Sequence, residues 1–303
     1  MTAPVTNHAS TGSFESTATL FERAPAKVNL SLRVLGRRTD GYHDLSSLVA
    51  FTGAADRLAL TLGAPLGLEV AGNVAALGDE ADNLVLKATR ALQALVPGLI
   101  AGHFHLTKRL PIAAGLGGGS ADAAAALRLL ARANGLALDD SRLFDAALAT
   151  GSDVPACLYG RACMMTGRGE NIAPVSLPRF GAVLVNPGVP VATADVFRML
   201  AIAPGTVLSH QAPAPASFNT REDVIAFLSN EPNDLEPPAQ RLAPDLDEVA
   251  SALWATPDVL LARMSGSGAT MFALYENCRH AARAAKMIAG AHPGWWVKST
   301  ILG

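Results

Sequence analysis

The chain has 303 residues, half of them hydrophobic and 17% charged, and its 26 acidic and 24 basic residues give a net charge of −2. A chain of this length is expected to form about two domains around cores that need no disulfide or metal. Without a cationic excess, a general nucleic-acid or membrane-surface binder is not expected. Only five of the basic residues are lysines, so any function that needs a lysine has few candidates.

The three cysteines, Cys157, Cys163 and Cys278, are an odd number without C-x-x-C spacing. This pattern argues against a disulfide framework and a structural zinc site, and it favours a reducing cytoplasm. Residues 1–20 contain eight Ser or Thr and no Lys or Arg, unlike a signal or transit peptide. We therefore expect a disordered tail over 1–20 and a cytoplasmic protein that is a monomer or weak homodimer.

The first predicted strand covers 27–34, where apolar and polar residues alternate strictly. Its polar face carries Lys27, Asn29, Ser31 and Arg33. A turn at 39–41 follows. The other elements expected before residue 150 are strands at 45–51, 58–62 and 104–106 and helices at 84–96, 121–133 and 140–149. Asn83 and Ser120 are the predicted N-caps of the first two helices.

A segment rich in glycine and proline, 167–178, is the candidate domain boundary. It divides the chain into an N-terminal domain over 21–168 and a C-terminal domain over 169–303. Strands are expected at 182–185 and 270–275, and helices at 193–199, 221–229, 245–254 and 279–289. The Pro/Ala-rich stretch 211–217 is expected to be a loop. Mixed strands and helices without a regular βαβ repeat predict an α+β fold.

The most informative segment is P-I-A-A-G-L-G-G-G-S-A-D-A-A-A-A-L, from Pro111 to Leu127. Four glycines expose backbone N–H groups directly before an alanine-rich helix. Such N–H groups and the positive end of a helix suit a phosphate. A glycine cluster is also typical of a flexible loop, but Ser120 and the helix that follows at once favour an anion site.

Two other well-known phosphate-binding motifs are absent from the sequence. No lysine follows a glycine, so a P-loop is excluded, and neither H-R-D nor D-F-G occurs. Gly115, Gly117 and Ser120 come close to the dinucleotide-binding G-x-G-x-x-G/A pattern, so an NAD(P)-dependent oxidoreductase stays open as an alternative. A catalytically silent nucleotide-binding module is a third hypothesis.

The glycine segment resembles the second motif of the GHMP kinase superfamily. The segment P-A-K-V-N-L-S-L-R-V-L-G-R-R-T-D-G-Y-H, from Pro25 to His43, resembles the N-terminal signature of members that act on 4-diphosphocytidyl-2-C-methyl-D-erythritol. G-S-D-V-P at 151–155 also agrees, and S-G-S-G-A at 265–269 resembles the third superfamily motif. These segments follow one another in the family order over about 25–275.

The resemblance implies a two-domain GHMP kinase fold with the active site in the cleft between domains. It implies transfer of a phosphoryl group from ATP, with Mg²⁺, to a hydroxyl of that cytidine substrate, in the non-mevalonate route to isoprenoid precursors. The alternative within the superfamily is a small-molecule kinase of the mevalonate or homoserine type.

The resemblance also assigns roles at the reacting end and the substrate end of the site. Asp153 is implied as the general base and Lys27 as the cation that stabilises its anionic form and the transferring group. Taken alone, Asp153 would be a turn cap and Lys27 a solvated strand residue. The substrate-binding residues implied besides Asp153 are Asn29, Tyr42, His43, Phe197, Gly266 and Gly268, with Tyr42 and Phe197 on opposite sides of the cytosine.

At the nucleotide end, the resemblance places Ser120 near the β-phosphate and Mg²⁺, with Asn83 and Lys108 toward the adenosine. The remaining ATP-binding residues implied are Pro111, Ala113, Ala114, Gly115, Leu116, Gly117, Gly118 and Gly119. Asn83 has a competing role as helix cap, and Lys108 could simply flank a strand.

Four further residues lie outside these assigned roles. Ala121 and Asp122 depart from the Ser and Asn of the family motif, and Asp122 is expected to point outward because a carboxylate opposes phosphate binding. His103 and His105 share a strand face with a spacing that suits a metal. No third ligand accompanies them in the sequence, so they are interpreted as ordinary strand residues.

Overall fold

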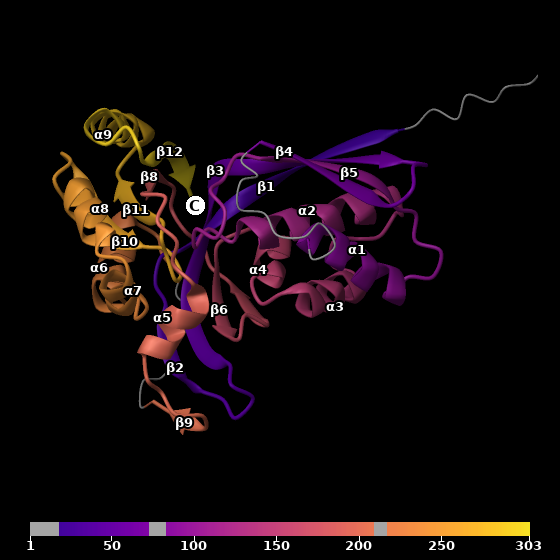
Figure 1. Ribbon diagram of the computed structural model, residues 1–303, viewed down its shortest axis with the longest axis horizontal. Coiled ribbons are helices and arrows are strands. Elements are labelled where there is room, and N and C mark those ends of the chain that lie inside the picture. Colours follow the sequence, from indigo (N-terminus) through magenta and orange to yellow (C-terminus); the bar gives the residue numbers. More distant parts are fainter. Residues whose placement is uncertain (1–17, 73–82, 209–216) are drawn as a thin grey trace, which may run out of the picture.

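The computed structural model describes residues 18–72, 83–208 and 217–303. Two lobes lie on either side of the long strand β3 (Figure 1). Most of the predicted tail, 1–17, and most of the predicted loop at 211–217 lie outside the described residues. Within the described part, no helix is long and apolar enough to cross a membrane.

The described strands join in one 12-stranded sheet in which β3 is the central member. β3 pairs along its length with β1, β2, β5 and β6, and it meets β12 at the pair formed by Thr52 and Leu302. The strands are β1 (Thr19–Asn29), β2 (Arg33–Arg37), β3 (His43–Leu62), β4 (Gly67–Gly72), β5 (Gly102–Lys108), β6 (Cys163–Gly167), β7 (Asn171–Pro174), β8 (Phe180–Asn186), β9 (Thr206–Val207), β10 (Val259–Met264), β11 (Met271–Tyr275) and β12 (Trp296–Leu302).

The helices divide between the two lobes (Figure 1). Helices α1 to α4 pack together beside β1 and β3, while α8 and α9 cover the sheet formed by β8, β10, β11 and β12. The described helices are α1 (Leu84–Leu95), α2 (Gly118–Ala133), α3 (Ser141–Thr150), α4 (Val154–Tyr159), α5 (Thr193–Met199), α6 (Arg221–Asn230), α7 (Glu236–Leu242), α8 (Asp245–Trp254) and α9 (Cys278–Ala291).

Helix α2 lies at the centre of the N-terminal lobe, between β1 and the other helices. Its residues Ala123 to Ala126 are completely buried. Alanine has the highest helix propensity, and its side chain is a single methyl group. This helix can therefore pack closely on all sides. The close packing fixes the helix, and with it the glycine segment that precedes it.

Most helices predicted from caps and periodicity are confirmed. Asn83 caps α1 by accepting the N–H of Val85, and Asp140 caps α3 in the same way. Helices α5 and α8 have the predicted bounds. The α+β fold class is likewise confirmed.

The predicted strand over 27–34 is wrong as one element. β1 ends at Asn29 and β2 begins at Arg33, because the chain leaves the sheet between them and Leu32 bridges to Asn233. The expected polar face is buried: Lys27 is 4% exposed and Asn29 fully buried. The strands predicted at 45–51 and 58–62 are parts of the single strand β3.

The predicted start of the second helix is also wrong. α2 begins at Gly118, with Gly117 as N-cap, so Ser120 lies inside the first turn. The short helix α4 was not predicted; Pro155 occupies its first turn, where the missing N–H removes no hydrogen bond. The domain boundary between 168 and 169 falls between β6 and β7, which pair with each other, and stays a prediction.

Candidate active site

A pocket of about 920 Å³ lies where the two lobes meet. Its size is in the range of sites that bind small molecules. Among the predicted site residues, those that line it are Lys27, Asn29, Tyr42, His43, Ala113, Ala114, Gly115, Gly117, Gly118, Gly119, Ser120, Asp153, Phe197 and Gly266. The predicted residues outside its lining are Asn83, Lys108, Pro111, Leu116 and Gly268.

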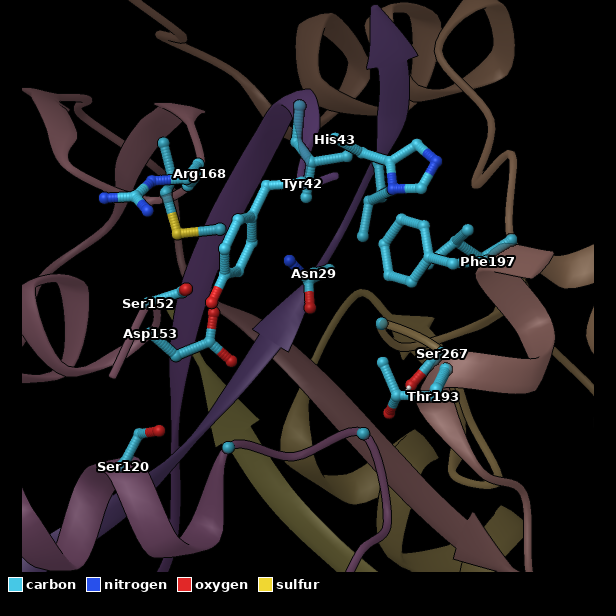
Figure 2. Close-up of a pocket in the computed structure, with 18 of the residues that line it drawn as sticks. Asn29, Tyr42, His43, Ser120, Ser152, Asp153, Arg168, Thr193, Phe197 and Ser267 are labelled. Carbon is cyan, nitrogen blue, oxygen red and sulfur yellow. Dashed lines mark hydrogen bonds between the residues drawn. The ribbon is translucent and has the colours of Figure 1, made fainter. Parts of the chain in front are cut away.

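Lys27 and Asp153 form an ion pair at the wall of this pocket. Lys27 Nζ lies 3.0 Å from Asp153 Oδ2 and donates to Asn29 Oδ1 at 2.6 Å. Asp153 occupies the N-cap position of α4, yet its side chain makes no cap hydrogen bond. The carboxylate is therefore directed to Lys27 and the pocket, and it keeps 30% side-chain exposure (Figure 2).

Asn29 is held by a buried hydrogen-bond chain. Its Nδ2 donates to Ser47 Oγ at 2.8 Å, and the Ser47 hydroxyl donates to the Ser31 carbonyl at 2.6 Å. All three side chains lie within the protein, where such bonds are strong because water does not compete. These hydrogen bonds fix the Asn29 side-chain amide so that its oxygen faces Lys27.

The glycine loop, defined here as residues 113–117, is bound on two sides. The N–H of Lys27 donates to Leu116 O at 3.0 Å, and the N–H of Thr270 donates to Ala114 O at 3.1 Å. Ser265 Oγ donates to Gly115 O at 2.9 Å and accepts the N–H of Asn29. The three sequence motifs therefore meet at this loop.

Two of the glycines are required by geometry. Gly115 has a φ of +72°, and a Cβ there would lie 2.3 Å from the Ser265 carbonyl oxygen. Gly117 has a φ of +61°, and its Cβ would lie 2.7 Å from Lys27 Cγ. Side chains at either position would clash and strain the backbone. The loop thus passes closer to its neighbours than any other residue type permits.

The first turn of α2 opens into the pocket. Gly118, Gly119 and Ser120 all line the pocket, and the first N–H groups of a helix have no acceptor within it. Together with the helix dipole, these donors form a site for an anion. The Ser120 side chain extends from the same turn (Figure 2).

Behind the loop, Lys108 lies in a sealed cluster with two carboxylates. Its Nζ donates to Asp122 Oδ2 at 2.7 Å and also to Asp56. Asp56 Oδ1 in turn accepts the backbone N–H of Arg109 at 2.5 Å and of Leu110 at 2.9 Å. The cluster therefore connects the end of β5, the residues just before the glycine loop and the second turn of α2.

Asp122 points inward, so the expectation that it faces outward is wrong. It is 2% exposed, and the Lys108 cation supplies the counter-charge that the sequence could not reveal. Burial, partly offset by Lys108, raises the pKa of Asp122 to about 7. Burial lowers the pKa of Lys108, but the charges of Asp122 and Asp56 outweigh that effect and leave it raised.

Aromatic side chains gather at the other end of the pocket. Phe197 stacks on His43 with ring centroids 4.7 Å apart, and the Arg168 guanidinium lies 5.0 Å from the Tyr42 ring centroid. Burial, with a contribution from Arg37, lowers the pKa of His43. Its Nε2 is buried without a hydrogen-bond partner among the described residues. In Figure 2, Tyr42 and Phe197 lie on either side of Asn29.

The pocket also contains residues that sequence reasoning missed. Thr193 Oγ1 and Ser267 Oγ are 2.7 Å apart at the substrate end. Ser267 belongs to the S-G-S-G-A segment, so the motif could have indicated it, whereas Thr193 required the fold. The other missed residues with polar side chains in the lining are Arg37, Ser152, Arg168 and Arg198.

Family comparison agrees with this geometry. Residues 83–161 match the model of the GHMP kinases N-terminal domain, and residues 221–293 match that of the GHMP kinases C-terminal domain. The chain belongs to the GHMP kinase family. The Rossmann-type alternative is therefore not retained for the glycine loop.

Curated relatives extend over nearly the whole chain. A protein of Xanthobacter autotrophicus named 4-diphosphocytidyl-2-C-methyl-D-erythritol kinase is 58% identical over 92% of this chain and 98% of its own. A protein of Rhodopseudomonas palustris with the same name is 56% identical, over 93% of this chain and 97% of that protein.

Solved structures share the GHMP kinase fold. A crystal structure of 4-(cytidine 5'-diphospho)-2C-methyl-D-erythritol kinase has a TM-score of 0.72 at 34% identity, covering 94% of this chain and 99% of that chain. A homoserine kinase from Cytophaga hutchinsonii has a TM-score of 0.68 at 19% identity, with 95% of each chain covered, and shows the shared fold alone.

Proposed function

We propose that this GHMP kinase transfers the γ-phosphoryl group of ATP to a hydroxyl of 4-(cytidine 5'-diphospho)-2-C-methyl-D-erythritol. The observation that carries the proposal is the Lys27–Asp153 ion pair in the same pocket as the N-terminus of α2. Relatives that are 53–58% identical over almost the whole chain bear the name of this kinase. The product would serve the non-mevalonate route to isoprenoid precursors.

The chemistry follows from the charges at the reacting end. Asp153 accepts the proton of the substrate hydroxyl as its oxygen attacks the γ-phosphorus, and the bond from that phosphorus to the β,γ-bridging oxygen of ATP breaks. The Lys27 ammonium stabilises negative charge on the transferring oxygens. ADP keeps the charge that develops on its terminal phosphate, which the N–H groups at the start of α2 face.

Mg²⁺ fits the oxygen donors at this end of the pocket. Ser120 with its hydroxyl and Asp153 with its carboxylate both line the pocket, and hard cations prefer such oxygen ligands. The ion, when bound together with ATP, would neutralise charge on the phosphates. Ser120 is the protein ligand that we propose for it.

The aromatic end supports a flat, hydrogen-bonding ligand such as cytosine. Tyr42 is 54% exposed and forms one wall, while the stacked His43 and Phe197 form another. The unpartnered Nε2 of His43 would gain a hydrogen bond from a base that reaches it. Mevalonate and homoserine carry no ring for these side chains, so this end favours the cytidine substrate over the alternatives.

ADP release with a panel of acceptors tests the proposal. The cytidine diphospho-methylerythritol should support turnover, whereas mevalonate, homoserine and galactose should not. Tyr42→Ala should raise the KM for the cytidine substrate by roughly 10-fold, because stacking is worth about 1–3 kcal/mol per base. Phe21→Ala, which removes an exposed ring far along β1, is the matched control. A change only in the KM for ATP would show that Tyr42 lies at the other end.

We further propose that the protein works in the cytoplasm as a monomer or weak homodimer. Cys157, Cys163 and Cys278 are free thiols, and two of them are buried, which suits a reducing compartment. Light scattering across a range of concentrations, with and without reductant, checks this. A tight oligomer at all concentrations would contradict it.

A further inference from the structure

His103 and His105 lie on one face of β5, outside the catalytic pocket. The parallel pairing of β4 with β5 places Glu69 directly opposite His105, and Gly67 opposite His103. The third ligand that the sequence did not supply near these histidines therefore comes from the neighbouring strand. It stands 34 residues before His103, so only the pairing register reveals it.

The three side chains converge. One ligand atom from each lies within 4.8 Å of the others, and His105 Nδ1 is 3.1 Å from Glu69 Oε2. The two imidazole ring centroids are 4.9 Å apart at an angle of 53°. Two nitrogens bound to one zinc ion at about 2.0–2.1 Å lie roughly 3.4 Å apart in a tetrahedron, so small side-chain rotations would complete the geometry.

Gly67 makes room for this arrangement. A Cβ at Gly67 would lie 2.7 Å from His103 Nδ1 and 2.9 Å from its Cε1. With no side chain there, the His103 ring lies over β4, on the side of the sheet where Glu69 extends. The same glycine would leave the ring free to turn toward a shared ion.

We propose that Glu69, His103 and His105 form a surface site for one divalent transition-metal ion, Zn²⁺ in the first instance. Two imidazoles and one carboxylate match the donors that zinc, nickel and copper prefer, and the rest of the coordination shell is open to water. Mg²⁺ prefers an all-oxygen octahedral shell and would not compete. The site is thus distinct in both place and metal preference from that proposed at Ser120.

The expected consequence is mechanical rather than catalytic. Among the described strands, β4 pairs only with β5 and so forms an edge of the sheet. An ion held between Glu69 and the two histidines would join that edge strand to β5. None of the three ligands lines the pocket, so occupancy should raise thermal stability without changing kcat.

Zn²⁺ titration calorimetry on the full chain, produced without an affinity tag, tests the site. The background is Cys278→Ser, because Cys278 is the exposed thiol. We expect one Zn²⁺ per chain, binding at least 10-fold weaker in His105→Ala and in His103→Ala, and weaker in Glu69→Gln. His292→Ala, which removes a histidine near Glu248 on another face, should bind as the parent does.

Unchanged zinc binding in a His103→Ala/His105→Ala double variant would overturn the proposal, and so would equal loss in His292→Ala. A second measurement needs no substitution at the proposed ligands. Ni²⁺ should broaden the imidazole NMR signals of His103 and His105 in the Cys278→Ser chain before those of His280 and His292. Broadening of the latter pair first would also overturn it.

Discussion

Two lysine–carboxylate sites lie next to the glycine-rich segment, one at Gly117 and one at Gly118, and they differ in access to solvent. Lys27 and Lys108 are equally buried, at 4% and 5% exposure. The carboxylate of Asp153 keeps 30% side-chain exposure at the pocket, whereas those of Asp56 and Asp122 keep 0% and 4%. The same chemical pair therefore serves two purposes. The open pair can exchange a proton with a ligand, and the sealed cluster can only hold its surroundings in place.

The cluster of Lys108, Asp56 and Asp122 also shows why a buried charge can be tolerated beside an anion site. Asp56 Oδ1 accepts the N–H groups of Arg109 and Leu110, just before the glycine loop, and Asp122 belongs to the second turn of α2. The cluster therefore holds both ends of the segment that we propose as the phosphate site. In that proposal the cluster supplies position, whereas Lys27 supplies charge.

The largest expected effect is on the open pair. Asp153→Asn should lower kcat by about 10²–10⁴-fold, because the amide cannot accept the substrate proton. ATP binding, measured by calorimetry, should stay close to that of the parent. Denaturant titration should show a folded protein that has lost some stability, because the buried Lys27 loses its counter-charge. Asp145→Asn, on the exposed side of α3, is the control. A kcat close to normal in Asp153→Asn would remove Asp153 as the base.

The next effect concerns the sealed cluster. Lys108→Met should lower the free energy of unfolding by about 3–5 kcal/mol, because it leaves two buried carboxylates without a counter-charge. Lys27→Met should cost less stability, since Asp153 can still be hydrated, but it should greatly reduce kcat. Urea titration and steady-state kinetics separate the two.

A double variant sharpens this contrast. Adding Asp122→Asn to Lys108→Met removes one of the two uncompensated carboxylates and should restore part of the lost stability. If Lys27→Met were as destabilising as Lys108→Met, or if the double variant were no better than the single one, the division into a reactive pair and a structural cluster would be wrong.

The last prediction is a gradual pH dependence of the free energy of unfolding that comes from Asp122. Its folded pKa of about 7 lies above the ordinary value, so between about pH 4 and 7 the folded chain holds a proton that the unfolded chain has lost. Because the folded state binds this proton and the unfolded state does not, the free energy of unfolding falls as pH rises through that window, by at most about 1.4 kcal/mol per pH unit. Asp122→Asn should flatten the decline by that contribution. An identical pH profile in Asp122→Asn, measured by urea titration at several pH values, would contradict the assignment.

Local signals predicted much of the molecule. The predicted cap at Asn83 and the apolar spacing gave helices close to their observed bounds, because a helix start depends on residues within one turn, although the cap predicted at Ser120 was wrong. The order of the glycine-rich motifs predicted the GHMP kinase fold, and most predicted site residues line one pocket. Local signals failed where β1 and β2 separate, since the break depends on a bridge to Asn233, some 200 residues away.

The sequence by itself determined the family, predicted a phosphate site at the glycine segment and limited the lysines that could serve it to five. Only the tertiary structure decided that Lys108 lies outside the pocket lining, that Asp122 turns inward to Lys108, and that Glu69 lies beside His103 and His105. Each of these depends on electrostatic or steric partners from distant segments. A charge is stable in the interior only where the fold brings its counter-charge, so the direction of such a side chain cannot be decided from its neighbours in the chain.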